Sequence, residues 1–244
     1  MKPGRRLRVL ISAGPTREPI DRVRFLSNAS TGAMGARLAA EALARGHRVS
    51  VVSGPVTETL PRAARVIRVE QAAQMEQALR RLSPWADVVI MAAAVCDFRL
   101  AHPLPGKLPR RGRLRLSLEA TPDLIRGLPR HRGQVVVGFS LEVSRVAERA
   151  RQKLREKRLD LLLAQRLAGS RTAAARRRRW SSDVSPFGRT SVEAWLVSRD
   201  GGVRPLGRRS KPRLARVLLD KIESLWYGQH EREDGHMPQR ARGA

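Results

Sequence analysis

The sequence predicts an α/β fold, a Rossmann-like parallel sheet flanked by helices, with a C-terminal antiparallel hairpin extension. Three observations predict it. Short apolar runs recur along the chain and alternate with longer stretches of helical period, which is typical of parallel strands covered by helices. The first apolar run leads through a glycine-punctuated polar loop into a helix. Near the end of the chain, apolar and polar residues alternate on both sides of a Gly-Gly turn.

Five short apolar runs are the expected parallel strands, because each has strand length and is bounded by polar or turn residues. They lie at Arg8–Ile11, Arg48–Ser53, Asp87–Ala94, Gln134–Phe139 and Leu159–Ala164.

Helices are expected between these strands, where apolar residues recur every three or four positions. They lie at Gly35–Arg45, Ala72–Leu82 and Val143–Lys157. The hairpin is expected over Val192–Val197 and Val203–Leu206, and a final helix over Lys211–Trp226.

One domain, residues 1–227, is expected, since 244 residues suit a single large core. Two stretches, at about 99–113 and 169–185, are rich in Pro, Gly, Ser or Arg and are expected to be mobile loops. Residues 228–244 have little apolar content and are expected to form a disordered polar tail.

Charge is the extreme feature of the composition, with a formal net value of +27. Clustered Lys and Arg favour nucleic acids through counterion release. Here arginine is scattered, its longest run is Arg176–Arg179, and aromatic residues for base stacking make up only 4% of the chain. Weak non-specific nucleic-acid binding, fading as salt rises, is therefore the expectation.

Membrane and metal classes are disfavoured by the same sequence. No apolar run reaches eighteen residues and no secretory leader is evident, so a cytoplasmic protein without membrane contact is expected. Cys96 is the only cysteine, which excludes an intramolecular disulfide and a multi-thiolate metal cage. No metal site built from protein side chains is expected.

The loop between the first strand and its helix predicts an anion site. Asn28, Ser30 and Thr31 place amide and hydroxyl groups just before a helix that begins near Gly32, where backbone N–H groups and the helix dipole favour an anion. Arg17 and Arg24 add full positive charges to the loop. The alternative is a turn whose polar residues only cap the helix. The loop lacks G-x-G-x-x-G, so NAD binding is disfavoured.

Motifs in order along the chain carry a family resemblance. They are GPTREPIDRVRFLSNASTGAMG, MAAAVCDFR at Met91–Arg99, GK at Gly106-Lys107, TPD at Thr121–Asp123, VGF at Val137–Phe139, ARQKLREKRLDLLLA at Ala150–Ala164 and SKPRLA at Ser210–Ala215. The chain resembles phosphopantothenate cysteine ligase, also called phosphopantothenoylcysteine synthetase, from about Arg8 to Trp226. No flavin-binding decarboxylase domain precedes the match, so a stand-alone ligase without flavin is expected, with a separate decarboxylase as pathway partner.

The resemblance implies a reaction of coenzyme A biosynthesis with phosphopantothenate, cysteine and CTP as substrates. The carboxylate attacks CTP to give an acyl cytidylate, and cysteine then displaces CMP. It also implies Mg²⁺ bound through the triphosphate, and a homodimer, for which the C-terminal hairpin is a candidate contact.

Site residues follow from the same motifs. The resemblance implies catalytic roles for Asn28 and Lys107, the latter on a flexible flap that orders over the nucleotide. It implies acid-substrate binding by Arg24, Ser30 and Ala94. It implies nucleotide binding by Met91, Ala92, Ala93, Asp97, Lys107, Thr121, Pro122, Phe139, Lys153 and Lys157.

Structural alternatives exist for several of these residues. Asn28 and Asp97 also suit caps, and Phe139 suits the core. Lys107 also suits a solvated loop. Lys153 and Lys157, four apart on one helix face, suit a solvated basic surface.

Departures from the family pattern keep a second function open. Ala33 stands where a Lys is common, Ser140-Leu141 replace alanines, Gln165 replaces an Asn and Val192 replaces an Asn. Arg37, one turn after Ala33, compensates only partly for the missing charge. The alternative is a nucleotide- or RNA-binding relative that has lost turnover.

Overall fold

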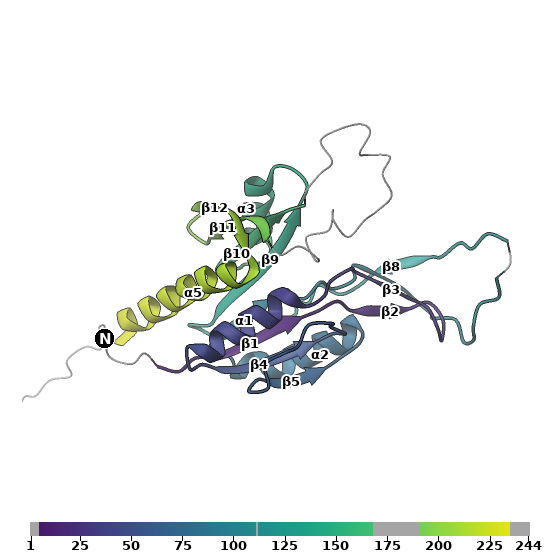
Figure 1. The fold of residues 1–244 in the computed structure, drawn as a ribbon, viewed down its shortest axis with the longest axis horizontal. Helices are drawn as coiled ribbons and strands as arrows, with labels where there is room; N and C mark the ends of the chain where they lie inside the picture. Colours follow the sequence, from purple (N-terminus) through teal and green to yellow (C-terminus); the bar gives the residue numbers. More distant parts are fainter. Residues whose placement is uncertain (1–4, 111, 168–190, 235–244) are drawn as a thin grey trace, which may run out of the picture.

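A computed structural model describes residues 5–110, 112–167 and 191–234 and contains an eight-stranded sheet with helices on both faces (Figure 1). The strands are β1 (Arg8–Ala13), β2 (Arg17–Pro19), β3 (Phe25–Ser27), β4 (Arg48–Ser53), β5 (Arg65–Arg68), β6 (Val88–Met91), β7 (Phe98–Leu100), β8 (Leu118–Ala120), β9 (Val135–Glu142), β10 (Leu161–Arg166), β11 (Ser191–Ser198) and β12 (Val203–Ser210). The helices are α1 (Ala33–Ala44), α2 (Ala72–Leu82), the short 3₁₀ turn η1 (Ser83–Trp85), α3 (Val146–Glu156) and α5 (Lys211–Asp234).

Strand order in the sheet is β12-β11-β10-β9-β6-β1-β4-β5. Six neighbouring strands pair in parallel, in the order β10, β9, β6, β1, β4 and β5. Strands β11 and β12 extend the sheet beyond β10 as antiparallel strands. This arrangement confirms the predicted Rossmann-like sheet with a C-terminal hairpin. The chain builds one half from β1 through β4 to β5, and then returns beside β1 with β6. The topological switch point therefore lies between β1 and β6, where open α/β sheets bind ligands at the carboxyl ends of their strands.

Side chains of the central strands alternate between two helix layers, as the period of two requires. Val9 and Ile11 of β1 belong to the cluster buried under α1 and α5, whereas Leu10 belongs to the cluster under α2. On β9, Val135 and Val137 face α5, and Val136 faces α3. Helices α1 and α5 thus cover one face of the sheet, and α2 and α3 cover the other.

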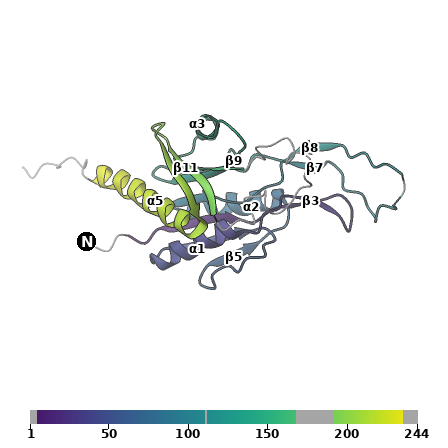
Figure 2. The same cartoon turned by 45° about the horizontal axis from the view of Figure 1, so that its top comes forward.

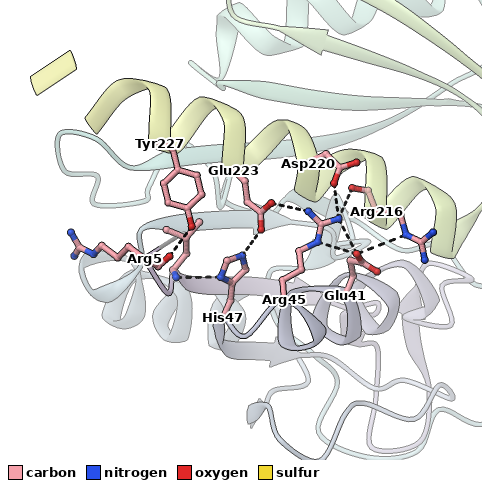
Figure 3. Close-up of polar contacts among 9 residues, drawn as sticks. Arg5, Glu41, Arg45, His47, Arg216, Asp220, Glu223 and Tyr227 are labelled. Atoms are coloured by element: carbon pink, nitrogen blue, oxygen red, sulfur yellow. Dashed lines mark hydrogen bonds and ion pairs between the residues drawn. The ribbon is translucent and has the colours of Figure 1, made fainter. Parts of the chain in front are cut away.

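Helix α5 lies beside α1, and ion pairs between side chains connect the two helices (Figure 3). Arg45, just after α1, reaches Glu223 at 2.9 Å and Asp220 at 2.7 Å. His47 Nε2 lies 2.8 Å from Glu223, and Tyr227 donates its hydroxyl proton to the Arg5 carbonyl at 2.7 Å. These contacts fix the middle and the C-terminal half of α5 against the start of the sheet.

Several elements differ from the sequence prediction. β5 was missed because its four residues hold only two apolar side chains, which is too short for a periodic signal. The hairpin of β2 and β3 was missed because each strand has three residues. α5 continues to Asp234, so residues 228–234 are helical and not part of the disordered tail that was predicted from residue 228. The rings of Trp226 and His230 stack with centroids 3.7 Å apart, a spacing of four residues that supports another turn.

An arm projects beyond the sheet in both ribbon views (Figures 1 and 2). We define it as residues 17–27, with β2 and β3, and the described residues 98–110 and 112–120, with β7 and β8. Leu104 N donates to Ile20 O at 2.9 Å, and Leu108 N donates to the Asp21 carboxylate at 3.0 Å. The stretch at about 99–113, predicted to be a mobile loop, begins with the end of β7, and hydrogen bonds from Leu104 and Leu108 attach it to the β2–β3 turn. The other predicted loop, 169–185, lies outside the described residues.

No helix within the described ranges is long and apolar enough to cross a membrane.

The Arg8–Asp87 pair ties β1 to the start of β6 and gives the fold a pH-dependent contact. Arg8 donates backbone and side-chain hydrogen bonds to the Asp87 carboxylate at 2.8 to 3.1 Å. Burial alone raises the pKa of Asp87, but the hydrogen bonds from Arg8 outweigh it, and the net pKa lies below 3.8. The stabilisation is therefore fully present above the unfolded-state pKa and is lost as pH falls through the folded-state pKa.

Asp87→Asn is expected to lower the free energy of unfolding at pH 7 by about 1 to 2 kcal/mol, because a charged hydrogen-bond acceptor is lost. Urea unfolding from pH 7 to pH 3 measures it, and the gap from wild type should close toward low pH. Glu70→Gln is the control, since its carboxylate is exposed and lies 3.9 Å from Arg17. A gap that stays constant from pH 7 to pH 3 contradicts this account.

Candidate functional site

A pocket of about 720 Å³ opens at the carboxyl ends of the central strands, at the switch point between β1 and β6. It reaches from the N-terminus of α1, on one face of the sheet, to α3 on the other. Twelve of the residues assigned by resemblance line it: Asn28, Ser30, Met91, Ala92, Ala93, Ala94, Asp97, Thr121, Pro122, Phe139, Lys153 and Lys157. Their roles stay predictions, but the fold brings these residues to one cavity.

The first wall of the pocket is the start of α1. Gly32 precedes the helix with φ of 82°, and a Cβ there would lie 2.3 Å from Val56 Cγ1, so the position requires glycine. Thr31, Gly32, Ala33 and Met34 line the cavity. The helix therefore directs its positive end toward the pocket, as the anion-site prediction requires.

Asn28 is not the cap of this helix, because Gly32 occupies that position and makes no side-chain capping bond. The Asn28 amide instead donates to the carbonyl oxygens of Ala94 at 3.1 Å and Val95 at 2.8 Å. An amide NH₂ has two donors, and both are used here. Asn28 thus connects the loop after β3 to the loop after β6 by two hydrogen bonds.

The second wall is the loop after β6, which is anchored to the end of β1. Ala93 N donates to Ser12 Oγ at 3.1 Å, and Ala94 N donates to Gly14 O at 2.9 Å. Thr121 Oγ1 donates to Cys96 O at 2.7 Å and joins the segment that follows β8 to the same loop. These bonds leave Asp97 exposed at the pocket edge.

The third wall holds Lys153 on α3 and Lys157 at its C-cap, each paired with a carboxylate. Lys153 Nζ lies 2.7 Å from Glu142, which is buried at the end of β9. Lys157 Nζ lies 3.3 Å from Asp123, which follows β8. Both lysines line the pocket, where their side chains are half-buried, and their role stays a prediction. The two carboxylates thus orient the ammonium groups in a pocket that Phe139 also lines.

Three predicted cations lie away from this pocket. The sequence placed Arg17 and Arg24 at the anion site, but neither lines the cavity, because β2 and β3 carry them out along the arm. Arg24 pairs with Asp21 at 3.0 Å, and Arg17 stacks on Phe25 with its guanidinium 4.5 Å from the ring centroid. Lys107 is exposed on the same arm and also lies outside the pocket lining.

Asp21 organises the part of the arm that carries Lys107. Its carboxylate accepts backbone N–H bonds from Leu108, Val23 and Arg24. These bonds, with that from Leu108 foremost, hold the pKa of Asp21 below its ordinary value. The arm segment next to Lys107 is thus attached to the β2–β3 turn.

The departures from the family pattern have different outcomes. Ala33, Ser140, Leu141 and Gln165 line the pocket, whereas Val192 is buried in the core and does not. Ser140 Oγ is buried and has no hydrogen-bond partner among the described residues, so a ligand atom can pair with it. Arg37 does not line the pocket and lies 3.7 Å from Glu58.

Sequence reasoning missed Ser12 and Lys211 as pocket residues. In the sequence, nothing distinguishes Ser12 from an ordinary buried strand residue. Lys211 belongs to a quoted motif, but its position at the pocket depends on how α5 packs against α1. Burial lowers the pKa of Lys211, Glu58 raises it and Arg37 lowers it, with a net value below the ordinary 10.5.

Comparison with known proteins adds a family model described as the DNA/pantothenate metabolism flavoprotein C-terminal domain, which matches residues 5–225. The Coenzyme A biosynthesis bifunctional protein CoaBC of Escherichia coli (strain K12) is 37% identical over 224 residues, covering 88% of this chain and 51% of that protein. A Cysteine/Cysteine sulfinic acid decarboxylase from a prokaryote of unknown identity is 40% identical over 228 residues, covering 92% of this chain and 60% of that protein.

The chain spans about half the length of the curated relatives it matches. Among solved structures, the crystal structure of the C-terminal domain of CoaBC is similar with a TM-score of 0.74 and 30% identity. The match covers 93% of this chain and 100% of that one.

Proposed function

This chain belongs to the DNA/pantothenate metabolism flavoprotein C-terminal domain family, and on that premise we propose that its pocket joins phosphopantothenate to cysteine, using CTP. The proposed role is the ligase step of coenzyme A biosynthesis. The observation that carries the proposal is the convergence of twelve motif residues, from five separate segments of the chain, on one 720 Å³ cavity at the switch point. That volume is within the roughly 300 to 1,000 Å³ of ordinary ligand sites.

The cavity has the chemistry that two anionic substrates need. The N-terminus of α1 favours negative charge at one end, and Lys153 and Lys157 supply positive charge at the other. Phe139 offers a flat apolar surface between them, suited to a nucleotide base. We assign the cytidine to the side of Thr121, Phe139 and Lys157, and the triphosphate to the side of α1.

In the first proposed step, a carboxylate oxygen of phosphopantothenate attacks the α-phosphorus of CTP and pyrophosphate leaves. The acid and the nucleotide are both anions, so the site must hold them together and neutralise the charge that builds at phosphorus. Ser30 and the backbone at Ala94 are assigned to the acid. Lys107 is assigned to the α-phosphate, which it reaches when the arm segment around it closes over the nucleotide.

In the second proposed step, the amine of cysteine attacks the acyl carbonyl, the C–O bond to the phosphate breaks and CMP leaves with that oxygen. The nitrogen loses a proton as the amide forms. Negative charge develops on the carbonyl oxygen during the attack, and a positioned N–H donor stabilises it. The Asn28 amide is assigned to this oxygen, exchanging its longer bond, at 3.1 Å to Ala94 O, for the new one.

Mg²⁺ on the triphosphate would supply further charge neutralisation. The hydroxyls of Ser30 and Thr31 and the carboxylate of Asp97 are oxygen donors at the pocket and suit a hard cation. Among the described residues, no three His, Cys, Asp or Glu side chains gather as a metal site, so the nucleotide is assigned most of its ligands.

We further propose a homodimer that forms through the arm. Among the described residues, five of the six exposed large apolar side chains lie in or beside it: Val23, Phe25, Phe98, Leu114 and Leu118. Exposed apolar groups gathered on one projection are typical of a protein contact. The edge strand β12 of the predicted contact hairpin instead carries Pro205 and three arginines, which protect an edge from pairing. Arg24, outside its own pocket, is then placed to bind the acid in the partner's pocket. Sedimentation velocity tests the dimer.

The test of the function is pyrophosphate release by the purified protein with phosphopantothenate, cysteine and Mg²⁺. Release is expected with CTP, to depend on phosphopantothenate, and to yield the amide product when cysteine is present. ATP in place of CTP measures the nucleotide preference. Protein that binds CTP but releases no pyrophosphate with either nucleotide would support the binding relative and reject the ligase.

A further inference from the structure

Lys211 is the first residue of α5 and stands on the pocket wall that α1 forms. The two helices run in the same direction, because Lys211 and Ala33 line the pocket at one end, while Arg45 and Glu223 meet at the other (Figures 1 and 3). Both helix N-termini therefore face the cavity. Two positive helix ends and one ammonium group meet at this wall.

The charges around Lys211 leave this end of the pocket positive. Glu58 and Arg37 are the charged groups that act on Lys211, and they lie 3.7 Å from each other. Glu58 is attached to the loop before α1, since its backbone N–H donates to Thr31 O at 3.4 Å. One carboxylate thus faces two cations. An anion entering from the pocket would balance the remaining charge.

This wall lies across the pocket from the two lysines at α3. Lys153 lies on α3 and Lys157 at its C-terminal end, whereas Lys211 lies on the side of α1 and α5, where Phe139 also packs. A nucleotide whose base lies near Lys157 and whose phosphates point toward α1 directs its terminal phosphates at Lys211. Only a triphosphate extends that far; the phosphate of a monophosphate stays near the middle of the pocket.

We propose that Lys211 is a nucleotide-positioning residue that binds the terminal phosphates of CTP, at the wall where the first turn of α1 presents Ala33. This inference rests on the proposed function for the identity of the nucleotide. A lysine suits the task because its ammonium is a compact point charge that pairs with phosphate oxygens.

The test compares the affinities of CTP and CMP, measured by calorimetry, in wild type and Lys211→Met. The methionine keeps the apolar stem and removes the charge. CTP binding is expected to weaken by about tenfold or more, while CMP binding changes by less than about twofold, because only the triphosphate reaches Lys211. Lys211→Arg, which keeps the charge, is expected to retain most of the preference for CTP. Lys221→Met, on the same helix but outside the pocket lining, is the control.

A second variant separates a charge effect from a change of fold. Ala33→Lys in the Lys211→Met background returns an ammonium group to the same wall and is expected to restore CTP affinity. The inference is overturned if Lys211→Met binds CTP and CMP in the wild-type ratio, or if it weakens both equally. If wild type binds CTP more tightly than CMP but catalyses no ligation, the proposed function is rejected. The effect of Lys211→Met on CTP binding then still tests the inference by itself. Wild type that binds neither nucleotide overturns both.

Discussion

Lys107→Ala is expected to lower the rate of CTP-dependent pyrophosphate release by about 100- to 1,000-fold, the usual loss when one group that stabilises transition-state charge is removed. Lys107 is exposed on the arm, so the variant should keep the thermal stability of wild type. Steady-state kinetics with a melting curve for each protein measure both quantities. The KM for CTP should change much less than kcat, because the ammonium acts at the α-phosphate only as bonds change there.

Arg110→Ala is the matched control, since it removes a positive charge from the same exposed segment. It should stay within about twofold of wild type, because screening by salt weakens a solvated charge at a distance. If Lys107→Ala keeps more than about a tenth of wild-type kcat, the lysine is a solvated loop residue and the assignment is wrong.

Asn28→Ala is expected to separate the two chemical steps. Amide formation should slow by about 100-fold or more, because the developing oxyanion loses its N–H donor, while acyl cytidylate formation slows by less than about tenfold. The acyl cytidylate should therefore accumulate, and rapid quenching with mass detection measures it. Asn28→Asp should be slower still in the second step, because a carboxylate repels the oxyanion and has no N–H to give.

A different outcome would assign Asn28 another task. Its amide already donates hydrogen bonds to the Ala94 and Val95 carbonyls. Loss of the amide can therefore also disturb the backbone at Ala94, which is assigned to the acid substrate. In that case both steps would slow together and no intermediate would accumulate. Equal losses in pyrophosphate release and amide formation contradict the oxyanion assignment and leave Asn28 as a positioning residue.

The sheet could be predicted because its strands are buried on both faces. β1, β4 and β9 appear in the sequence as continuous apolar runs, and the helix intervals set their parallel order. The pocket could then be placed as well, because open parallel sheets bind ligands at the carboxyl ends of their strands. The end of α5 could not be predicted, because residues after Gly228 are polar and their helix depends on the stacking of His230 on Trp226.

The cations of the site were the least predictable part. Arg17, Arg24 and Lys107 lie close in sequence to pocket residues, but short strands carry all three onto the arm. Lys211 lies far from them in sequence and reaches the pocket only through packing of α5 on α1. Sequence spacing reports local geometry, whereas these positions depend on contacts between distant segments.

The transfer of one oxygen atom tests the central claim most directly. Phosphopantothenate labelled with ¹⁸O in its carboxylate is converted in the presence of CTP, cysteine and Mg²⁺, and the CMP is analysed by mass spectrometry. The account predicts one ¹⁸O in the phosphate of CMP, because the carboxylate oxygen attacks phosphorus and stays with it when the amine displaces CMP. CMP that carries no label, formed while the amide accumulates, would contradict an acyl cytidylate in this pocket.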